Sequence, residues 1–108
     1  MSAINMTDGT GKSLLTLLKE AGIWIGVATF TWDPASLADG AGETSAGITV
    51  TDAALGDLVL VGAPYDLQDC TVTGYVQAAN TVEVRLQNES GGVRDLASGT
   101  WKVVVLRL

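Results

Sequence analysis

The strongest constraint on the fold is a set of short segments in which apolar and polar residues alternate. The clearest pair covers residues 70–78, "CTVTGYVQA", and residues 81–88, "TVEVRLQN". A period of two places successive side chains on opposite faces of a β-strand. In the first segment one face carries Cys70, Val72 and Val76 and the other Thr71, Thr73 and Tyr75. In the second segment Val82, Val84 and Leu86 point one way and Glu83, Arg85 and Gln87 the other. Only Ala79 and Asn80 separate the segments, which predicts a hairpin.

Four more segments are rich in β-branched and aromatic residues. They are residues 23–32 "IWIGVATFTW", 45–51 "SAGITVT", 57–64 "DLVLVGAP" and 99–108 "GTWKVVVLRL". The stretches 33–45 and 88–99 are loops by their content of Gly, Ser, Asp and Asn. Many short strands with turn signals between them predict a mainly β domain over residues 23–108, an antiparallel β-sandwich or jelly roll.

A short amphipathic helix is predicted before the first strand. In residues 12–21, "KSLLTLLKEA", the apolar side chains Leu14, Leu17, Leu18 and Ala21 recur at helical spacing, and Gly22 suits the position after a helix. About ten residues form no stable helix alone in water, so the leucine stripe must dock on something. The stripe docks either on its own domain or on a neighbour. We therefore expect residues 1–22 to be an arm, with Leu14, Leu17 and Leu18 as candidate partner contacts.

Two predicted strands are apolar on both faces. In the first, Ile23, Ile25 and Val27 alternate with Trp24, Ala28 and Phe30, and in the last, Val103 and Val105 alternate with Val104 and Leu106. A two-layer domain covers only one face of each sheet, so the second face meets the helix or another subunit. Because 47% of the residues are apolar, we favour an oligomer. The candidate interface residues are Trp24, Phe30, Val104, Leu106 and Leu108.

Composition argues against several classes of function. The chain of 108 residues carries a net charge of −6 without a basic stripe, so we expect no binding to nucleic acid or to an anionic membrane. No stretch is apolar for long enough to span a membrane, and no signal-peptide pattern opens the sequence, which favours synthesis in a cytoplasm. The single cysteine, Cys70, begins an alternating apolar run and is expected to be a buried thiol.

The stretch "DGTGKS", residues 8–13, ends like a phosphate-binding loop. The complete motif needs a glycine five residues before Gly11, and that position is Met6. The loop must also follow a buried strand, and "MSAINMT" does not read as one. We therefore interpret the stretch as the entry to the short helix and expect neither a nucleotide nor any other cofactor.

No arrangement of residues predicts catalysis. Histidine is absent, and Lys12, Lys19 and Lys102 stand in no recognisable catalytic context. Paired carboxylates could act on a glycoside, and the loop candidates are Asp33, Asp39, Glu43, Asp66 and Asp69. Loop acids are usually solvated, so we expect no enzyme and no metal site. Calcium binding by Asp66 and Asp69 with backbone carbonyls, and sugar stacking on Trp24, Trp32 or Trp101, are the weaker alternatives.

Several stretches carry a resemblance to a known family. They are Trp32-Asp33-Pro34, "AALGD" at Ala53–Asp57, "YVQAANTVEVRLQN" at Tyr75–Asn88 and "DLASGTWKV" at Asp95–Val103. From about Ala28 to the C-terminus the chain resembles a β-domain that recurs in virion proteins of tailed bacteriophages. Such domains occur in head decoration or cement proteins, head fibres and fibre tips. The resemblance implies a structural module, without catalysis, that forms a homotrimer.

The length of the arm helps to choose among these places on a virion. Only about 27 residues precede the similar region, whereas a tail fibre normally needs a long shaft. We therefore expect a decoration (cement) protein on the capsid exterior, bound to the major capsid protein through its arm. A protein that binds only the assembled shell stabilises it by mass action. The alternative is a head- or tail-fibre tip, an adhesin that binds a host receptor or glycan through surface tryptophans and loops.

Overall fold

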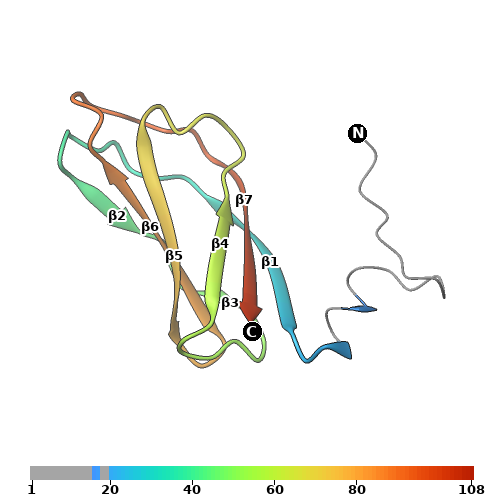
Figure 1. Cartoon of the computed structure of the whole chain (residues 1–108). Coiled ribbons are helices and arrows are strands. Elements are labelled where there is room, and N and C mark those ends of the chain that lie inside the picture. Colours follow the sequence, from blue (N-terminus) through green and yellow to red (C-terminus); the bar gives the residue numbers. More distant parts are fainter. Residues whose placement is uncertain (1–15, 18–19) are drawn as a thin grey trace, which may run out of the picture.

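The computed structural model describes residues 16, 17 and 20–108, and the described chain is built almost entirely of strands (Figure 1). The strands are β1 (Trp24–Trp32), β2 (Gly42–Thr44), β3 (Ile48–Thr49), β4 (Leu58–Gly62), β5 (Cys70–Ala78), β6 (Thr81–Asn88) and β7 (Gly99–Arg107). Their sequences are rich in β-branched and aromatic residues, which suit a pleated, half-buried surface.

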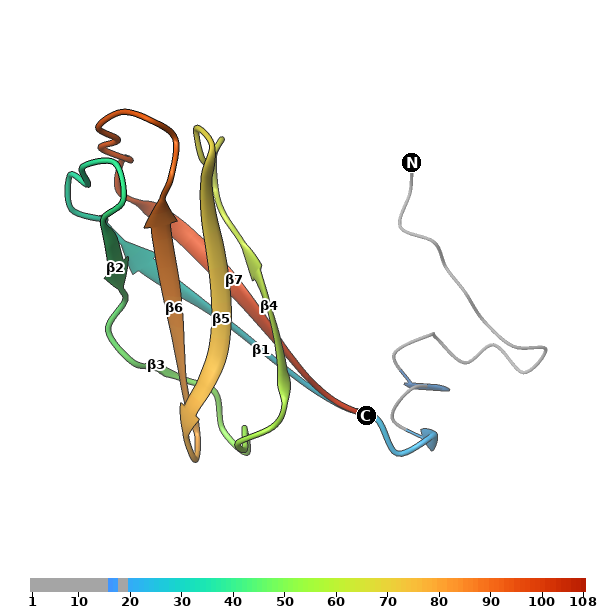
Figure 2. The ribbon, with the colours of Figure 1, turned by 60° about the vertical axis from the view of Figure 1, so that its left-hand side comes forward.

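The strands form two antiparallel sheets. One sheet has the order β1-β7-β4, and in the other β6 lies between β5 on one side and β2 and β3 on the other. Figure 2 shows the two sheets as layers, with β5 and β6 in front of β7 and β4. The predicted mainly β fold with antiparallel sheets is confirmed, and the arrangement is that of a β-sandwich.

The predicted hairpin is present with its turn in the expected place. Strand β5 ends at Ala78, β6 begins at Thr81, and Asn80 has a φ of 63°. Asparagine tolerates this left-handed conformation better than most residues, which suits it to the turn. Because β5 and β6 pair across their full length, the predicted inner set of side chains faces the opposite sheet.

The core lies between the two sheets. Its fully buried side chains come from the alternating positions of β6 and β7: Val82, Val84, Leu86, Trp101, Val103 and Val105. Aromatic rings pack together at one end of the core. The ring centres of Trp32 and Trp101 lie 5.1 Å apart, and the Tyr65 ring meets the Trp101 ring edge-on, with 5.7 Å between their centres. Such tilted and edge-on contacts favour aromatic packing beyond the burial of area.

A glycine allows β4 and β5 to pack closely at one side of the sandwich. Gly74 of β5 lies against β4, and a Cβ atom added at this position would come 2.5 Å from Val59 Cγ1 and 2.8 Å from Val61 Cγ2. The missing side chain therefore lets the edge strands of the two sheets approach each other closely.

Two predicted loops contain structure that the sequence pattern did not indicate. Residues 33–45 include β2, and Leu37 and Arg94 exchange backbone hydrogen bonds of 2.8 and 2.9 Å. The side chain of Asn88 explains the order: it donates to the carbonyls of Leu37 at 2.9 Å and Gly92 at 2.8 Å, and it is fully buried. One buried amide thus ties the two loops together.

The predicted N-terminal helix lies mostly outside the described residues. Thr16, Leu17 and Glu20 have helical backbone, and the Ala21 N–H donates to the Leu17 carbonyl at 3.0 Å. Gly22 follows with a φ of 87°, the conformation that commonly ends a helix. Leu14, Leu18 and the "DGTGKS" stretch lie outside the described residues. Within the described part, no helix is long and apolar enough to span a membrane.

Candidate functional site

The most unusual surface of the domain is the outer face of the sheet β1-β7-β4. The strand register places Ile25, Leu106 and Leu58 in one row across the three strands, and Val27, Val104 and Leu60 in the next. Side chains directly opposite in antiparallel strands share a face, so these six residues form one continuous patch. We call this patch the outer apolar face.

The outer apolar face is open to solvent in the described chain. Val27 is 66% exposed, Leu60 58% and Leu58 52%, while Ile25, Val104 and Leu106 are half-buried among their neighbours. Beyond the two rows, the same side of the sheet continues with Thr29, Lys102 and Gly62. Isolated exposed leucines are ordinary, but a contiguous patch of this kind marks a contact surface for protein or another apolar partner.

The structure places the five predicted interface residues in different surroundings. Val104 and Leu106 belong to the outer apolar face, and Leu108 follows β7 and is exposed. Trp24 and Phe30 point the other way and pack against the core. The strand alternation alone leaves open which face of a doubly apolar strand is inside. Leu58 and Leu60 of β4 also belong to this face, although they were not among the predicted interface residues.

Trp24 turns inward because a glycine makes room for its ring. A Cβ atom at Gly26 would come 2.7 Å from Trp24 Cη2 and 2.9 Å from Val50 Cγ1. The Arg107 guanidinium carbon lies 4.8 Å from the centre of the Trp24 ring, a cation–π contact. The tryptophan is therefore engaged by its own domain.

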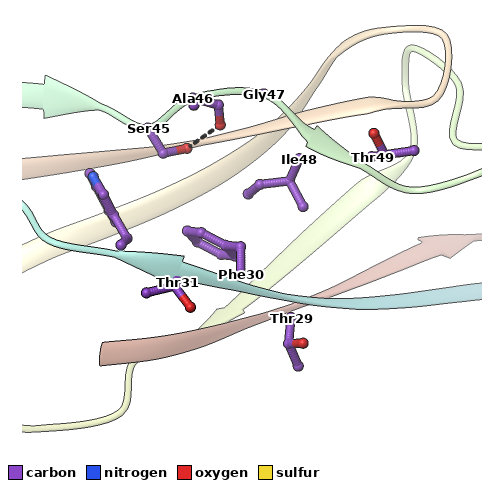
Figure 3. A pocket seen from close by; sticks show the side chains of 9 residues that line it. Thr29, Phe30, Thr31, Ser45, Ala46, Gly47, Ile48 and Thr49 are labelled. Atoms are coloured by element: carbon purple, nitrogen blue, oxygen red, sulfur yellow. Dashed lines mark hydrogen bonds between the residues drawn. The ribbon is translucent and has the colours of Figure 1, made fainter. Parts of the chain in front are cut away.

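A groove of about 390 Å³ runs between the free edge of β1 and the segment that joins β2 to β3. Figure 3 shows Phe30 and Ile48 pointing toward each other across it, with Ser45 and Ala46 joined by a hydrogen bond of 2.9 Å. The nine lining residues run from Thr29 to Trp32 and from Ser45 to Thr49, and none is charged. The groove thus supplies no carboxylate or lysine that could serve as an acid or base.

The candidate carboxylates support loops and do not converge. Asp39 accepts from the Gly91 N–H at 3.0 Å, Glu43 from the Ala35 N–H at 2.7 Å, and Asp66 from the Gln68 N–H at 3.0 Å. Asp33 and Asp69 are exposed. Among residues 16, 17 and 20–108, no three His, Cys, Asp or Glu side chains gather as metal ligands would.

The other candidate groups belong to the interior. Trp101 is fully buried and Trp32 nearly so, and therefore neither offers a ring face on which a sugar could stack. Cys70 is buried as expected, and burial raises the pKa of its thiol above the ordinary value. A thiol of this kind is a poor nucleophile at neutral pH.

Arg107 and Asp57 form the best-organised charged pair of the described chain, at the end of the sheet near Trp24. Two hydrogen bonds of 2.9 and 2.8 Å join the guanidinium to the two carboxylate oxygens. The pair lowers the pKa of Asp57 and raises that of Arg107, and it links the last strand to the turn before β4. The pair has a structural role, because both carboxylate oxygens of Asp57 accept hydrogen bonds from Arg107.

The outer apolar face therefore remains the surface with the clearest functional character. No family model, no curated protein and no solved structure matches the chain.

Proposed function

We propose that this chain is a structural virion protein of a tailed bacteriophage, a decoration (cement) protein that binds the exterior of the assembled head. The observation that carries the proposal is the outer apolar face, two adjacent rows of aliphatic side chains that are partly open to solvent. Such a surface serves assembly and offers no reactive group for chemistry. The similarity of residues from about 28 onward to phage virion β-domains supports this class of assembly.

In this proposal two separate surfaces make the two kinds of contact. The β-domain associates with other copies of the chain, as a homotrimer, and the leucines of the arm contact the major capsid protein. Burying one leucine contributes roughly 1.5–3 kcal/mol, and several arms on one oligomer add their contributions through avidity. Because a decoration protein binds the assembled shell and not the free subunit, its binding stabilises the shell.

The fibre-tip alternative has less support from the geometry. An adhesin that recognises glycans usually presents aromatic ring faces to solvent, whereas Trp32 and Trp101 pack inside this domain and Trp24 is covered by Arg107. We therefore propose that the protein is made in the host cytoplasm and is located on the exterior of the head.

The test uses undecorated heads of the phage that carries this chain. The heads are mixed with the full-length protein at limiting concentration, sedimented, and scored for bound protein by gel densitometry and cryo-electron microscopy. We expect saturable binding to the outside of the shell and an increase in the temperature at which the shell opens. Absence of binding to heads, with a folded protein, would overturn the proposal.

A second comparison tests the arm. The double change Leu14→Ser and Leu18→Ser removes two leucines of the predicted stripe, and we expect at least a tenfold loss of occupancy. Lys12→Ser with Lys19→Ser is the matched control, since these residues lie largely opposite the stripe on the predicted helix. Equal occupancy of the two variants would show that the leucine stripe is not the anchor, while leaving decoration itself in place.

A further inference from the structure

We propose that residues 1–7 of the chain form a further β-strand, which pairs antiparallel with the free edge of β1 and fills the groove beside it. The inference goes beyond the proposed function and does not depend on it, because it concerns only how the chain closes its own domain. Its physical basis is the edge of β1, the uncharged groove along that edge, and the length of chain that precedes β1.

The edge of β1 lacks the protection that the other edge strands have. β1 pairs with β7 over nine consecutive residues without a bulge, and among the described residues its backbone pairs with no other segment. Its sequence, "WIGVATFTW", contains neither a charged residue nor a proline. By contrast, β2 and β3 have only three and two residues, β4 packs against Gly74 of β5, and β5 carries a bulge between Val76 and Ala78. A long edge without charge, proline or bulge is a site for strand addition unless something covers it.

The groove along this edge suits an uncharged peptide strand. It runs between Thr29–Trp32 of β1 and the segment Ser45–Thr49, and Phe30 and Ile48 point toward each other across it (Figure 3). In an antiparallel ladder every second residue directs both its N–H and its C=O group away from the partner strand. Alternate residues of β1 therefore offer backbone donors and acceptors toward the free edge. A peptide strand satisfies these groups along the whole edge, whereas a small apolar ligand does not.

Residues 1–7, "MSAINMT", have the composition that this site requires. None of them has a charged side chain, and Ile4 and Met6 alternate with Ala3, Asn5 and Thr7. A strand with large apolar side chains on one face and small or polar ones on the other buries one side only. Such a strand fits an edge, and it differs from the strand covered on both faces that a phosphate-binding loop follows.

The chain before β1 is long enough to bring residues 1–7 to this edge. Antiparallel pairing of Ile4 with Phe30 places Thr7 beside Val27, three residues from the beginning of β1 at Trp24. That distance is about 10 Å at about 3.3 Å per residue. Residues 8–23 span it readily: with residues 12–21 as a helix of about 15 Å, residues 8–11, 22 and 23 remain, each reaching up to about 3.4 Å.

This pairing gives the arm a second attachment to the β-domain. The loop of residues 8–23 is then held at Thr7 as well as at Trp24. A loop that is fixed at both ends has less conformational freedom to lose when its leucines dock on a partner. The added strand also places Ile4 and Met6 over the open side of the core, next to Phe30.

Disulfide cross-linking in the full-length protein tests the position of the strand. The proposed register puts Ala3 opposite Thr31, whose side chain is exposed, so Ala3→Cys with Thr31→Cys should form a disulfide within one chain under mild oxidation. Thr100 of β7 is the partner of Thr31 on the side away from the free edge. Ala3→Cys with Thr100→Cys is the matched control, because two strand spacings of about 4.8 Å exceed the reach of a disulfide. Cys70 is buried and does not compete.

We expect the first pair to cross-link within one chain and the control pair to stay reduced. A disulfide between two chains would show that the strand comes from a neighbouring copy, and it would overturn the proposal. Absence of a disulfide in both pairs would overturn it as well.

Amide hydrogen exchange gives a second measurement that needs no new cysteine. Ile4→Asp places a charge in the uncharged groove, whereas Asn5→Asp adds the same charge on the outward face of the proposed strand. We expect alternate amides of Thr29–Trp32 to exchange at least about tenfold faster in Ile4→Asp than in the wild type, and Asn5→Asp to match the wild type. Circular dichroism checks that all three proteins are folded. Equal exchange in the three would overturn the inference.

These outcomes are separate from those of the decoration test, which changes Leu14 and Leu18. A protein that coats heads but shows no cross-link between positions 3 and 31 would keep the proposed function and remove the added strand. A protein that forms the cross-link but ignores heads would establish the strand and remove the proposed function.

Discussion

Arg107 holds Asp57 by two hydrogen bonds, of 2.9 Å from Nε to Oδ1 and 2.8 Å from Nη2 to Oδ2. The same Nη2 donates to the Asp52 carbonyl at 2.8 Å, and the guanidinium covers the Trp24 ring. One side chain at the end of β7 thus joins the turn before β4 to the beginning of β1. Arg107 therefore makes contacts beside the ends of all three strands of the sheet β1-β7-β4.

This pair makes the free energy of unfolding depend on pH in the acidic range, from about pH 3.8 downward. The Arg107 hydrogen bonds, and a further one from the Ala54 N–H, hold the pKa of Asp57 below its ordinary 3.8. A folded-state pKa below the unfolded value stabilises the fold above that pH, and the contribution is lost as pH falls toward the folded pKa. Asp57→Asn should therefore lower the melting temperature at neutral pH, with a difference from wild type that shrinks in acid. Asp33→Asn, at an exposed loop carboxylate, is the control, and a pH-independent difference for Asp57→Asn would contradict this reading.

Gly74 is expected to be the least replaceable glycine of the two sheets. Alanine at this position would push Val59 and Val61 of β4 away from β5, because its Cβ would lie 2.5 Å from a valine methyl. We expect Gly74→Ala to cost about 1–3 kcal/mol in the free energy of unfolding. Gly62→Ala is the matched control, since the nearest atom to its Cβ is 3.8 Å away. Chemical denaturation compares the two, and equal midpoints would show that the β4–β5 contact can relax.

Asn88 should be as important for stability as a large core residue. Its amide donates to Leu37 and Gly92, and its carbonyl oxygen accepts from the Ser90 N–H at 3.0 Å and the Ser90 hydroxyl at 2.7 Å. Asn88→Ala removes these four hydrogen bonds and leaves a space in the interior, at a cost on the order of 3 kcal/mol. Denaturant unfolding measures the change, with the exposed Gln77→Ala as control. A loss below about 1 kcal/mol would mean that water replaces the amide.

Nucleotide binding at "DGTGKS" is not expected, because the first glycine of the phosphate loop is replaced by Met6. Isothermal titration with ATP and magnesium should give no heat beyond dilution. Micromolar affinity that disappears in Lys12→Ala would contradict the prediction, while affinity that Lys12→Ala leaves unchanged would place the nucleotide elsewhere on the protein.

The sequence by itself determined the β5–β6 hairpin and the alternation of its side chains between two faces. Alternation in residues 70–88 places Val82, Val84 and Leu86 together, and the same short-range rule predicts the turn at Asn80. These features depend on neighbours within one hairpin, and therefore a local pattern is enough to predict them.

Only the tertiary structure decided which face of the doubly apolar strands is the outer one. Trp24 and Phe30 face the core because Gly26 leaves space for one ring and Trp101 pairs across the sheet with the other, whereas Val27 and Val104 remain outside. Leu58 and Leu60 join them only because β4 pairs with β7, where their partners Leu106 and Val104 stand 48 and 44 positions later in the chain. Burial of this kind follows from long-range register and from the space that neighbours leave, neither of which a period-two pattern contains.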